Sequence, residues 1–184
     1  MTTIDIPGYR AGTWILDPAH SEVTFSVRHM MISKVRGSFG MKSATLVAPE
    51  NPLDAKVEAT VDVTSLDTND DGRDGHLRSA DFFDIENFPT MQFVSTGARV
   101  ASDDFFIDGD LTIRGITKPV SFAFDFGGFG TDPYGNYKAG ASATTTINRE
   151  DFGLTWNAAL ETGGVLVGKD ITINLDLQGA LQQD

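Results

Sequence analysis

The three histidines of this 184-residue chain, His20, His29 and His76, are the side chains best suited to bind a metal ion or to carry a proton. Two ligands on one strand must point to the same face and therefore stand at even spacing, because successive side chains alternate. His20 and His29 are nine residues apart, so a regular strand would turn them to opposite faces. The spacing argues against a metal site. His20, in the segment Asp17-x-x-His20-Ser21, is expected to make a structural hydrogen bond at a strand end.

A second arrangement with chemical potential is the acidic run Asp67-Thr68-Asn69-Asp70-Asp71-Gly72, which matches the opening of an EF-hand calcium loop. That loop needs a bidentate Glu at its twelfth position, and Arg78 stands there instead. A cation cannot replace a carboxylate ligand. The run is therefore predicted to be an acidic turn that caps a short helix.

Catalytic signatures are absent from the sequence. It contains no Gly-x-Ser-x-Gly, no phosphate-binding glycine loop, no His-Glu-x-x-His and no cysteine nucleophile. The carboxylate pairs Asp70-Asp71 and Asp103-Asp104 lie in segments typical of solvated turns. No catalytic residue is assigned, and the protein is not expected to be an enzyme.

The net charge of the chain indicates which classes of binding partner are unfavourable. With 14 basic and 26 acidic residues, the formal net charge is -12. Nucleic acid is a poor partner for such a surface, because binding the phosphate backbone needs local positive charge. The opening residues MTTIDIPGYR have no cationic start and no apolar run, so a secretory signal is not expected, and no later run is long enough for a membrane-spanning helix. A cytoplasmic location is the expectation.

Alternation of apolar and polar residues with a period of two dominates the chain. It is clear over residues 23–27, 57–63, 107–113, 120–126, 139–147 and 171–177. One apolar and one polar face per strand is typical of an antiparallel sheet. The turns are rich in Gly, Pro and Asp, and about eight such strands predict an all-β fold with a single closed antiparallel barrel.

The predicted interior of this barrel combines small and aromatic residues. The small residues are Ala59, Gly109, Ala139, Ala141 and Ala143, and the chain holds 13 Phe but only 3 Tyr. Phe can line a dry cavity because it has no hydroxyl group to satisfy. An eight-stranded barrel is wide enough either to be filled by its side chains or to hold one slim ligand. An apolar tunnel and a solid core both stay open at this point.

The long connection from Asp74 to Ser95 is predicted to carry buried side chains of its own. A short helical segment is expected within residues 70–88, and Pro89 ends it before a new strand. Phe82 and Phe83 stand between two aspartates, so at least one ring is expected to be buried. Such a connection is predicted to be a plug or a lid.

Five segments in order resemble the YceI-like family. They cover roughly residues 12 to 178. The segments are Trp14-x-Leu16-Asp17-x-x-His20-Ser21 with Val23-x-Phe25-x-Val27-x-His29; Gly37-Ser38-Phe39; His76-Leu77-Arg78-Ser79-Ala80-Asp81-Phe82-Phe83-Asp84 with Phe88-Pro89; Gly109-x-Leu111-Thr112-x-x-Gly115-x-Thr117-Lys118-Pro119-Val120; and Arg149-x-Asp151-Phe152-Gly153.

This resemblance implies a lipocalin-like barrel over residues 12–180, after a tail of residues 1–11, that binds a polyisoprenoid-type lipid. The expected ligand is one long apolar amphiphile, either a polyisoprenoid lipid or an isoprenoid quinone, held without a covalent bond. A homodimer is also implied by the resemblance. The alternative is a filled barrel that serves as a structural or protein-interaction module without a ligand.

The predicted cavity residues lie on the inward faces of the strands and on the long connection. They are Phe25, Val27, Phe39, Met41, Val57, Ala59, Val61, Phe83, Phe93, Leu111, Ile113, Phe122, Phe124, Ala141, Ala143, Ile147, Ile173 and Leu175.

The entrance is predicted at the connection after residue 28. Residues 23–49 contain four cations and no carboxylate, and the connection holds Met30 and Met31, flexible side chains that suit a sliding apolar chain. Lys34 and Arg36 would attract an anionic head group or an anionic membrane surface, so transient membrane contact is expected. A plain cationic hairpin is the alternative. Arg149 is expected to tie a loop, or else to contact the head group.

Overall fold

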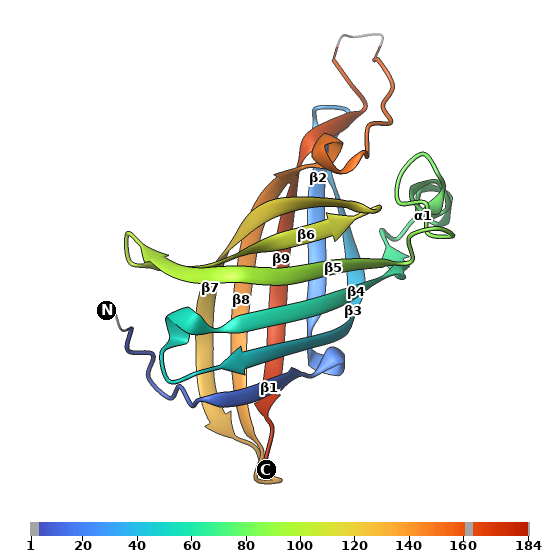
Figure 1. The fold of residues 1–184 in the computed structure, drawn as a ribbon. Helices are drawn as coiled ribbons and strands as arrows, with labels where there is room; N and C mark the ends of the chain where they lie inside the picture. Colours follow the sequence, from blue (N-terminus) through green and yellow to red (C-terminus); the bar gives the residue numbers. More distant parts are fainter. Residues whose placement is uncertain (1–3, 161–163, 184) are drawn as a thin grey trace.

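The computed structural model describes residues 4–160 and 164–183. Nine strands and one α-helix make up most of it, and Figure 1 shows the strands wrapped around a common interior. The strands are β1 (Gly12–Leu16), β2 (Glu22–His29), β3 (Ser33–Ala48), β4 (Lys56–Asp67), β5 (Thr90–Ala101), β6 (Asp104–Ile113), β7 (Ile116–Thr131), β8 (Tyr137–Asn148) and β9 (Val167–Leu181); the helix is α1 (Asp71–Arg78), with short 3-10 turns η1 (Pro18–His20), η2 (Pro52–Asp54) and η3 (Arg149–Phe152).

All strand pairs are antiparallel, and the sheet closes on itself. Neighbours follow the order β2-β9-β8-β7-β6-β5-β4-β3, and β3 pairs again with β2. β1 and β2 run in the same direction along β3, with the turn η1 between them, so they share one strand position. The result is the predicted closed eight-stranded barrel, in which each of the eight strand positions has a neighbour on both sides.

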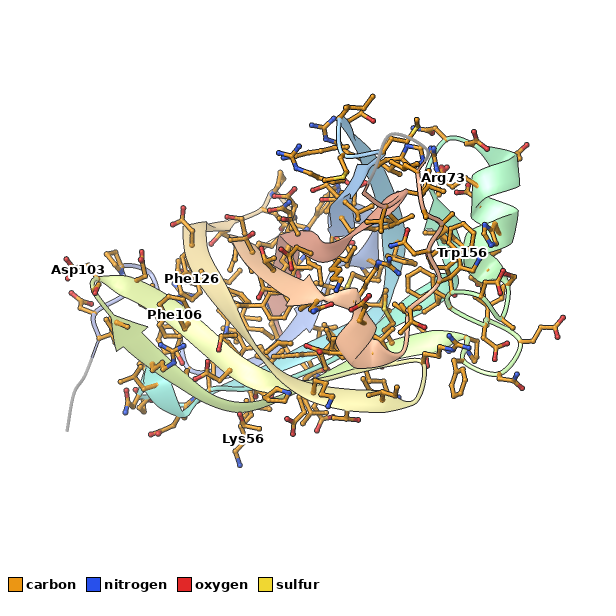
Figure 2. The ribbon with its side chains drawn as sticks, turned by 90° about the horizontal axis from the view of Figure 1, so that it is seen from above. Lys56, Arg73, Asp103, Phe106, Phe126 and Trp156 are labelled. Atoms are coloured by element: carbon orange, nitrogen blue, oxygen red, sulfur yellow. The ribbon has the colours of Figure 1, made fainter. Side chains whose placement is uncertain are left out.

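The two ends of the barrel differ. One end, called the α1 end, gathers α1, the β2–β3 and β6–β7 turns, and η3 with residues 153–160 and 164–166. The opposite end, called the collar end, gathers the residues before β1, the turn η2, and the β5–β6 and β7–β8 turns. In Figure 2 the side chains of Phe126 and Trp156 mark these opposite ends.

Burial changes along the barrel axis. On β4, Val63 near the α1 end is only 1% exposed, whereas Val61, Ala59 and Val57 along the same inward face are only partly buried. The compact core, which includes Phe39, Leu66, Phe82, Ile147 and Phe152, therefore fills the α1 end of the interior.

The predicted helical segment is present, and its start follows ordinary capping chemistry. Asp70 is the N-cap of α1, and its carboxylate accepts a hydrogen bond from the Arg73 amide at 2.9 Å. Asp74, in the first turn, is buried and accepts hydrogen bonds from the amide and the hydroxyl group of Thr68. The acidic run after β4 thus caps a helix, as the sequence predicts.

Candidate functional site

The larger of two apolar cavities, the outer cavity, lies at the collar end and has a volume of about 140 Å³. Its walls come from seven strands, β1, β3, β4 and β6 to β9, and from the residues before β1, because inward positions of widely separated strands meet there. They are almost entirely apolar, and include Trp14, Leu46, Phe105, Phe126, Phe129, Ala139 and Ala141.

The inner cavity continues deeper into the barrel, has a volume of about 120 Å³ and lies among aliphatic and aromatic side chains. Both cavities are bordered by Leu16, Ala44, Val57, Ile107, Phe124 and Leu177, so the two are neighbours along the axis. Neither reaches the roughly 300–1,000 Å³ typical of a ligand pocket, and only as one joined space do they approach its lower limit. The interior therefore suits a slim chain and not a bulky ring system.

Most of the predicted cavity residues line one of these spaces. Those at the inner cavity are Met41, Val57, Ala59, Val61, Phe93, Leu111, Ile113, Phe122, Phe124, Ile173 and Leu175, and Ala141 lies at the outer cavity.

The other predicted cavity residues, Phe25, Val27, Phe39, Phe83, Ala143 and Ile147, line neither cavity. Phe39 and Ile147 belong to the packed core, and Phe25 and Phe83 pack against it. The Phe39 ring lies 5.3 Å from that of Phe25 and 5.5 Å from that of Phe83, centroid to centroid. This aromatic group fills the α1 end of the barrel, which is why these side chains do not border an open space.

One small residue does not create space. A Cβ atom at Gly109 would collide with the Phe93 ring and with the Val94 carbonyl oxygen, 2.6 Å away. The Phe93 ring already occupies the volume that the glycine leaves on β6. Of the small residues expected to widen the tunnel, Ala59, Ala139 and Ala141 do border cavities, whereas Gly109 and Ala143 do not.

Sequence reasoning missed several wall residues, and Ala44 on β3 shows why. The pairing of β3 with β4 shifts register between Met41 and Ser43, which marks a β-bulge. Both Met41 and Ala44 then face the inner cavity, although an odd spacing would place them on opposite faces of a regular strand. Alternation alone gives Ile107 and Leu177 as inward positions, and Ala139, a small residue expected in the interior, lies at the outer cavity. Phe126 and Phe129 are separated by another register shift on β7.

An aromatic collar lies on one side of the outer cavity and consists of Trp14, Phe105, Phe126, Phe129 and Tyr137; all of these except Tyr137 border the cavity. Neighbouring rings are 5.5 to 6.3 Å apart, centroid to centroid, as in ordinary aromatic packing. The collar joins β1, β6, β7 and β8 into one rim.

Residues 6–11 form a strap that is fixed to this collar. The Tyr9 hydroxyl donates to the Pro49 carbonyl oxygen at 2.6 Å, and the Tyr137 hydroxyl donates to that of Gly8 at 2.6 Å. The Arg10 guanidinium lies 3.7 Å from the centroid of the Tyr137 ring, a cation–π distance. Burial raises the pKa of the Tyr9 hydroxyl, and the nearby Glu50 carboxylate raises it further.

At the α1 end, a plug formed by residues 76–88 is attached to its neighbours by Arg114 and His76. The Arg114 guanidinium donates to the carbonyl oxygens of Ala80 at 2.7 Å and Gly153 at 3.1 Å. The His76 ring packs edge-on to Trp156, at 4.6 Å, and hydrogen-bonds to Asp81 at 2.9 Å. The expected burial of at least one ring in this connection is confirmed: Phe82 is buried in the core.

Arg149 is a structural tether. Its side chain is only 2% exposed, and it donates to the carbonyl oxygens of Leu154, Trp156, Val167 and Gly168. Four of the five guanidinium N–H groups are thus used inside the fold. The tie to a loop is what the geometry shows, and a head-group contact gains no support from it.

The residues of the predicted entrance, Met30, Met31, Lys34 and Arg36, lie in or beside the β2–β3 turn at the α1 end. They line neither cavity, and the outer cavity lies at the other end of the barrel. Their role at an entrance stays a prediction.

Of the three histidines, His20 makes the structural hydrogen bond expected for it. The His20 ring hydrogen-bonds to the Asp17 carboxylate at 2.7 Å, next to the start of β2, which confirms its structural bond. This hydrogen bond lowers the pKa of Asp17. Within residues 4–160 and 164–183, no cluster of three or more His, Cys, Asp or Glu side chains forms a metal-binding group. In the same part of the chain, no helix has the length and apolar character needed to cross a membrane.

Comparison with known proteins places this geometry among related chains. The sequence model of the YceI-like domain matches residues 14–179. A UPF0312 protein of Staphylococcus aureus (strain MSSA476) is 37% identical over 169 residues, which is 91% of this chain and 96% of the relative.

Solved structures share the fold. BcnA of Burkholderia cenocepacia superposes with a TM-score of 0.74 at 22% identity and covers 89% of this chain and 98% of its own. A domain from Saccharophagus degradans, described as polyisoprenoid-binding, reaches 0.69 at 12% identity and covers 92% and 98%. At these identities the likeness establishes the barrel alone.

Proposed function

Since this chain belongs to the YceI-like domain family, we propose that its barrel holds the apolar chain of one long amphiphile. The observation that carries the proposal is the pair of adjacent apolar cavities in a closed barrel. A protein interior is normally packed to crystal-like density, with few voids larger than a water molecule. Two neighbouring spaces of about 140 and 120 Å³ are therefore a feature that calls for an occupant.

The chemistry of the walls indicates the ligand class. With almost no polar group on the walls, binding rests on buried apolar area, which contributes about 25 cal/mol per Å². An isoprenoid chain fits this description, and the S. degradans neighbour is described as a polyisoprenoid-binding domain. The ligand proposed here is a polyisoprenoid lipid or an isoprenoid quinone, whose head group stays outside the two cavities.

The collar end is the entrance that the geometry favours. The outer cavity lies there, and the strap of residues 6–11, which lies at the same end, is held by only a few hydrogen bonds. The α1 end is filled by the packed core around Phe39, Phe82 and Phe152. A chain that enters at the collar would run inward towards Val61 and stop at this core.

The second candidate is a filled barrel that works as a structural or interaction module. The small volume of each cavity is the observation that favours it. Neither candidate requires a catalytic step. A homodimeric state and a cytoplasmic location accompany the first candidate as predictions.

Organic extraction of the purified protein, followed by mass spectrometry, separates the two candidates. A bound amphiphile should be recovered in a fixed ratio to the folded protein and should disappear after the protein is unfolded and washed on a solid support. An extract identical to that of an unrelated protein from the same host would overturn the lipid proposal. The protein should then be offered isoprenoid quinones and polyprenols of increasing length, with binding followed by Trp fluorescence.

A further inference from the structure

The turn between β2 and β3 has an unusual backbone for its residues. Met30 and Met31 have φ values of 54° and 61°, and the Ile32 amide donates to the His29 carbonyl oxygen at 3.3 Å. Two left-handed central residues define a type I′ turn, which favours Asn and Gly. For a side chain such as Met this conformation is unfavourable, and such strain often marks a functional position.

Two other hairpins, whose turns also contain two consecutive left-handed residues, make the contrast clear. The β5–β6 turn uses Ser102 and Asp103, and the β6–β7 turn uses Arg114 and Gly115. Each of them includes a residue that tolerates this backbone, Asp103 in the first turn and Gly115 in the second. The β2–β3 turn instead accepts the strain with two apolar residues.

These apolar side chains point into solvent and form an apolar tip together with a neighbouring segment. Met30, Met31 and Ile32 are 45%, 58% and 81% exposed, and Val165 is 40% exposed. Met31 lies so close over Gly164 that a side chain at that position would collide with it, and the Met30 amide donates to the Leu166 carbonyl oxygen at 2.7 Å. Figure 1 shows the end of β2 at the top of the molecule, beside the orange segment that leads to β9.

Cations lie directly behind the apolar tip. Arg28 pairs across the hairpin with Lys34, and Arg36 pairs with Ser26. All three cations are exposed, and alternation places them together on the outward face. They belong to a run of 27 residues, Val23 to Pro49, that contains no Asp or Glu, in a chain whose net charge is -12.

We propose that the apolar tip, backed by Arg28, Lys34 and Arg36, docks the protein on an anionic phospholipid bilayer. Apolar side chains would enter the interface between head groups and acyl chains, and the cations would contact the anionic head groups. A bilayer needs no complementary pocket, whereas a stable protein partner buries about 800 Å² on each side, more than a single turn presents. This inference goes beyond cargo binding and does not depend on it.

The test measures binding of the full chain to vesicles by flotation. One set is phosphatidylcholine alone, and the other contains phosphatidylserine as well. Wild-type protein should float with the anionic set at low salt and progressively less as salt is raised. The variant Arg28→Gln/Lys34→Gln/Arg36→Gln should lose about fivefold in partition for each cation removed.

The apolar contribution has its own variant, Met30→Asn/Met31→Gly. Asn-Gly suits the type I′ turn, so the hairpin should fold at least as well while the apolar tip is lost. Binding to anionic vesicles should fall at least tenfold, with an unchanged or higher melting temperature. Lys56→Gln, an exposed cation at the start of β4, removes a charge far from the apolar tip and should bind like wild type. Figure 2 shows Lys56 pointing away from the barrel.

Two results would each overturn the proposal. One is equal flotation of the wild type with neutral and anionic vesicles. The other is equal vesicle binding by Met30→Asn/Met31→Gly and wild type; if the oligomeric state of that variant changes at the same time, the apolar tip is a contact between two copies. Lipid extraction from the same variants reports separately on the cargo, so failure of one proposal does not decide the other.

Discussion

The Phe83 ring meets the Phe39 ring edge to face, with 5.5 Å between their centroids. This contact joins the plug to β3 and ends the apolar interior at the α1 end. Phe82, the adjacent residue, is more deeply buried and packs against Trp156 at 5.4 Å. The two neighbouring rings therefore secure the plug on two different sides.

The first prediction compares these two rings. Phe82→Ala should lower the free energy of unfolding by about 3–5 kcal/mol, because it opens a void in the packed core. Phe83→Ala should cost less, about 1–3 kcal/mol, since the ring is only partly buried. Urea denaturation followed by fluorescence measures both. A cost below about 1 kcal/mol for Phe82→Ala would show that the plug lies loosely on the barrel.

The second prediction concerns Ala59, which borders the inner cavity. Ala59→Phe should abolish recovery of the bound amphiphile while the protein stays folded, because the new ring fills the space that the apolar chain of the lipid would occupy. If the interior is already solid, the same change should instead cost about 1–3 kcal/mol by overpacking. Glu58→Phe adds an equal ring to the outer face of β4 and serves as the control. It should leave the lipid content unchanged.

The third prediction tests the structural role of Arg149. Arg149→Met leaves several buried carbonyl oxygens without a donor and should cost about 3 kcal/mol or more. Arg149→Lys keeps the charge but replaces the planar guanidinium donors with one ammonium group. Its free energy of unfolding should therefore lie between those of Arg149→Met and wild type. Asp151→Asn, an exposed neighbour, should change stability by less than about 0.5 kcal/mol. A stable Arg149→Met that has lost its lipid would favour the head-group contact instead.

The fourth prediction concerns the pH dependence of the stabilisation that Tyr9 in the strap provides. The pKa of Tyr9 is raised above its ordinary value of 10.0, so the folded chain keeps this proton to higher pH than the unfolded chain. The stabilisation is therefore complete below about pH 10 and is lost as the pH rises through the folded-state value. Phenolate formation can be followed by ultraviolet absorbance as the pH is raised. The difference between wild type and Tyr9→Phe should show one tyrosine that ionises at a higher pH than an ordinary tyrosine.

The same variant tests whether the strap controls access to the barrel. Tyr9→Phe loses the hydrogen bond to the Pro49 carbonyl oxygen at the collar. Exchange of a fluorescent isoprenoid analogue should become faster, with little change in melting temperature. Unchanged exchange would argue against entry at the collar end.

The sequence alone determined the strands, the closed barrel and the helix after β4. These features follow from local rules: alternation fixes which side chains share a face, and Asp70 caps the helix through atoms three residues away. Inward positions that this alternation gives, from Val57 to Leu175, make up much of the inner cavity wall.

Only the tertiary structure decided where the interior is open. A register shift after Met41 brings Ala44 to the cavity, and the Phe93 ring fills the space beside Gly109. The Phe25, Phe39 and Phe83 rings come from distant segments and close one end of the barrel. Alternation gives the face on which a side chain lies, but free volume depends on which rings from other strands reach the same place. A local sequence pattern therefore does not predict the free volume inside the barrel, because distant segments determine it together.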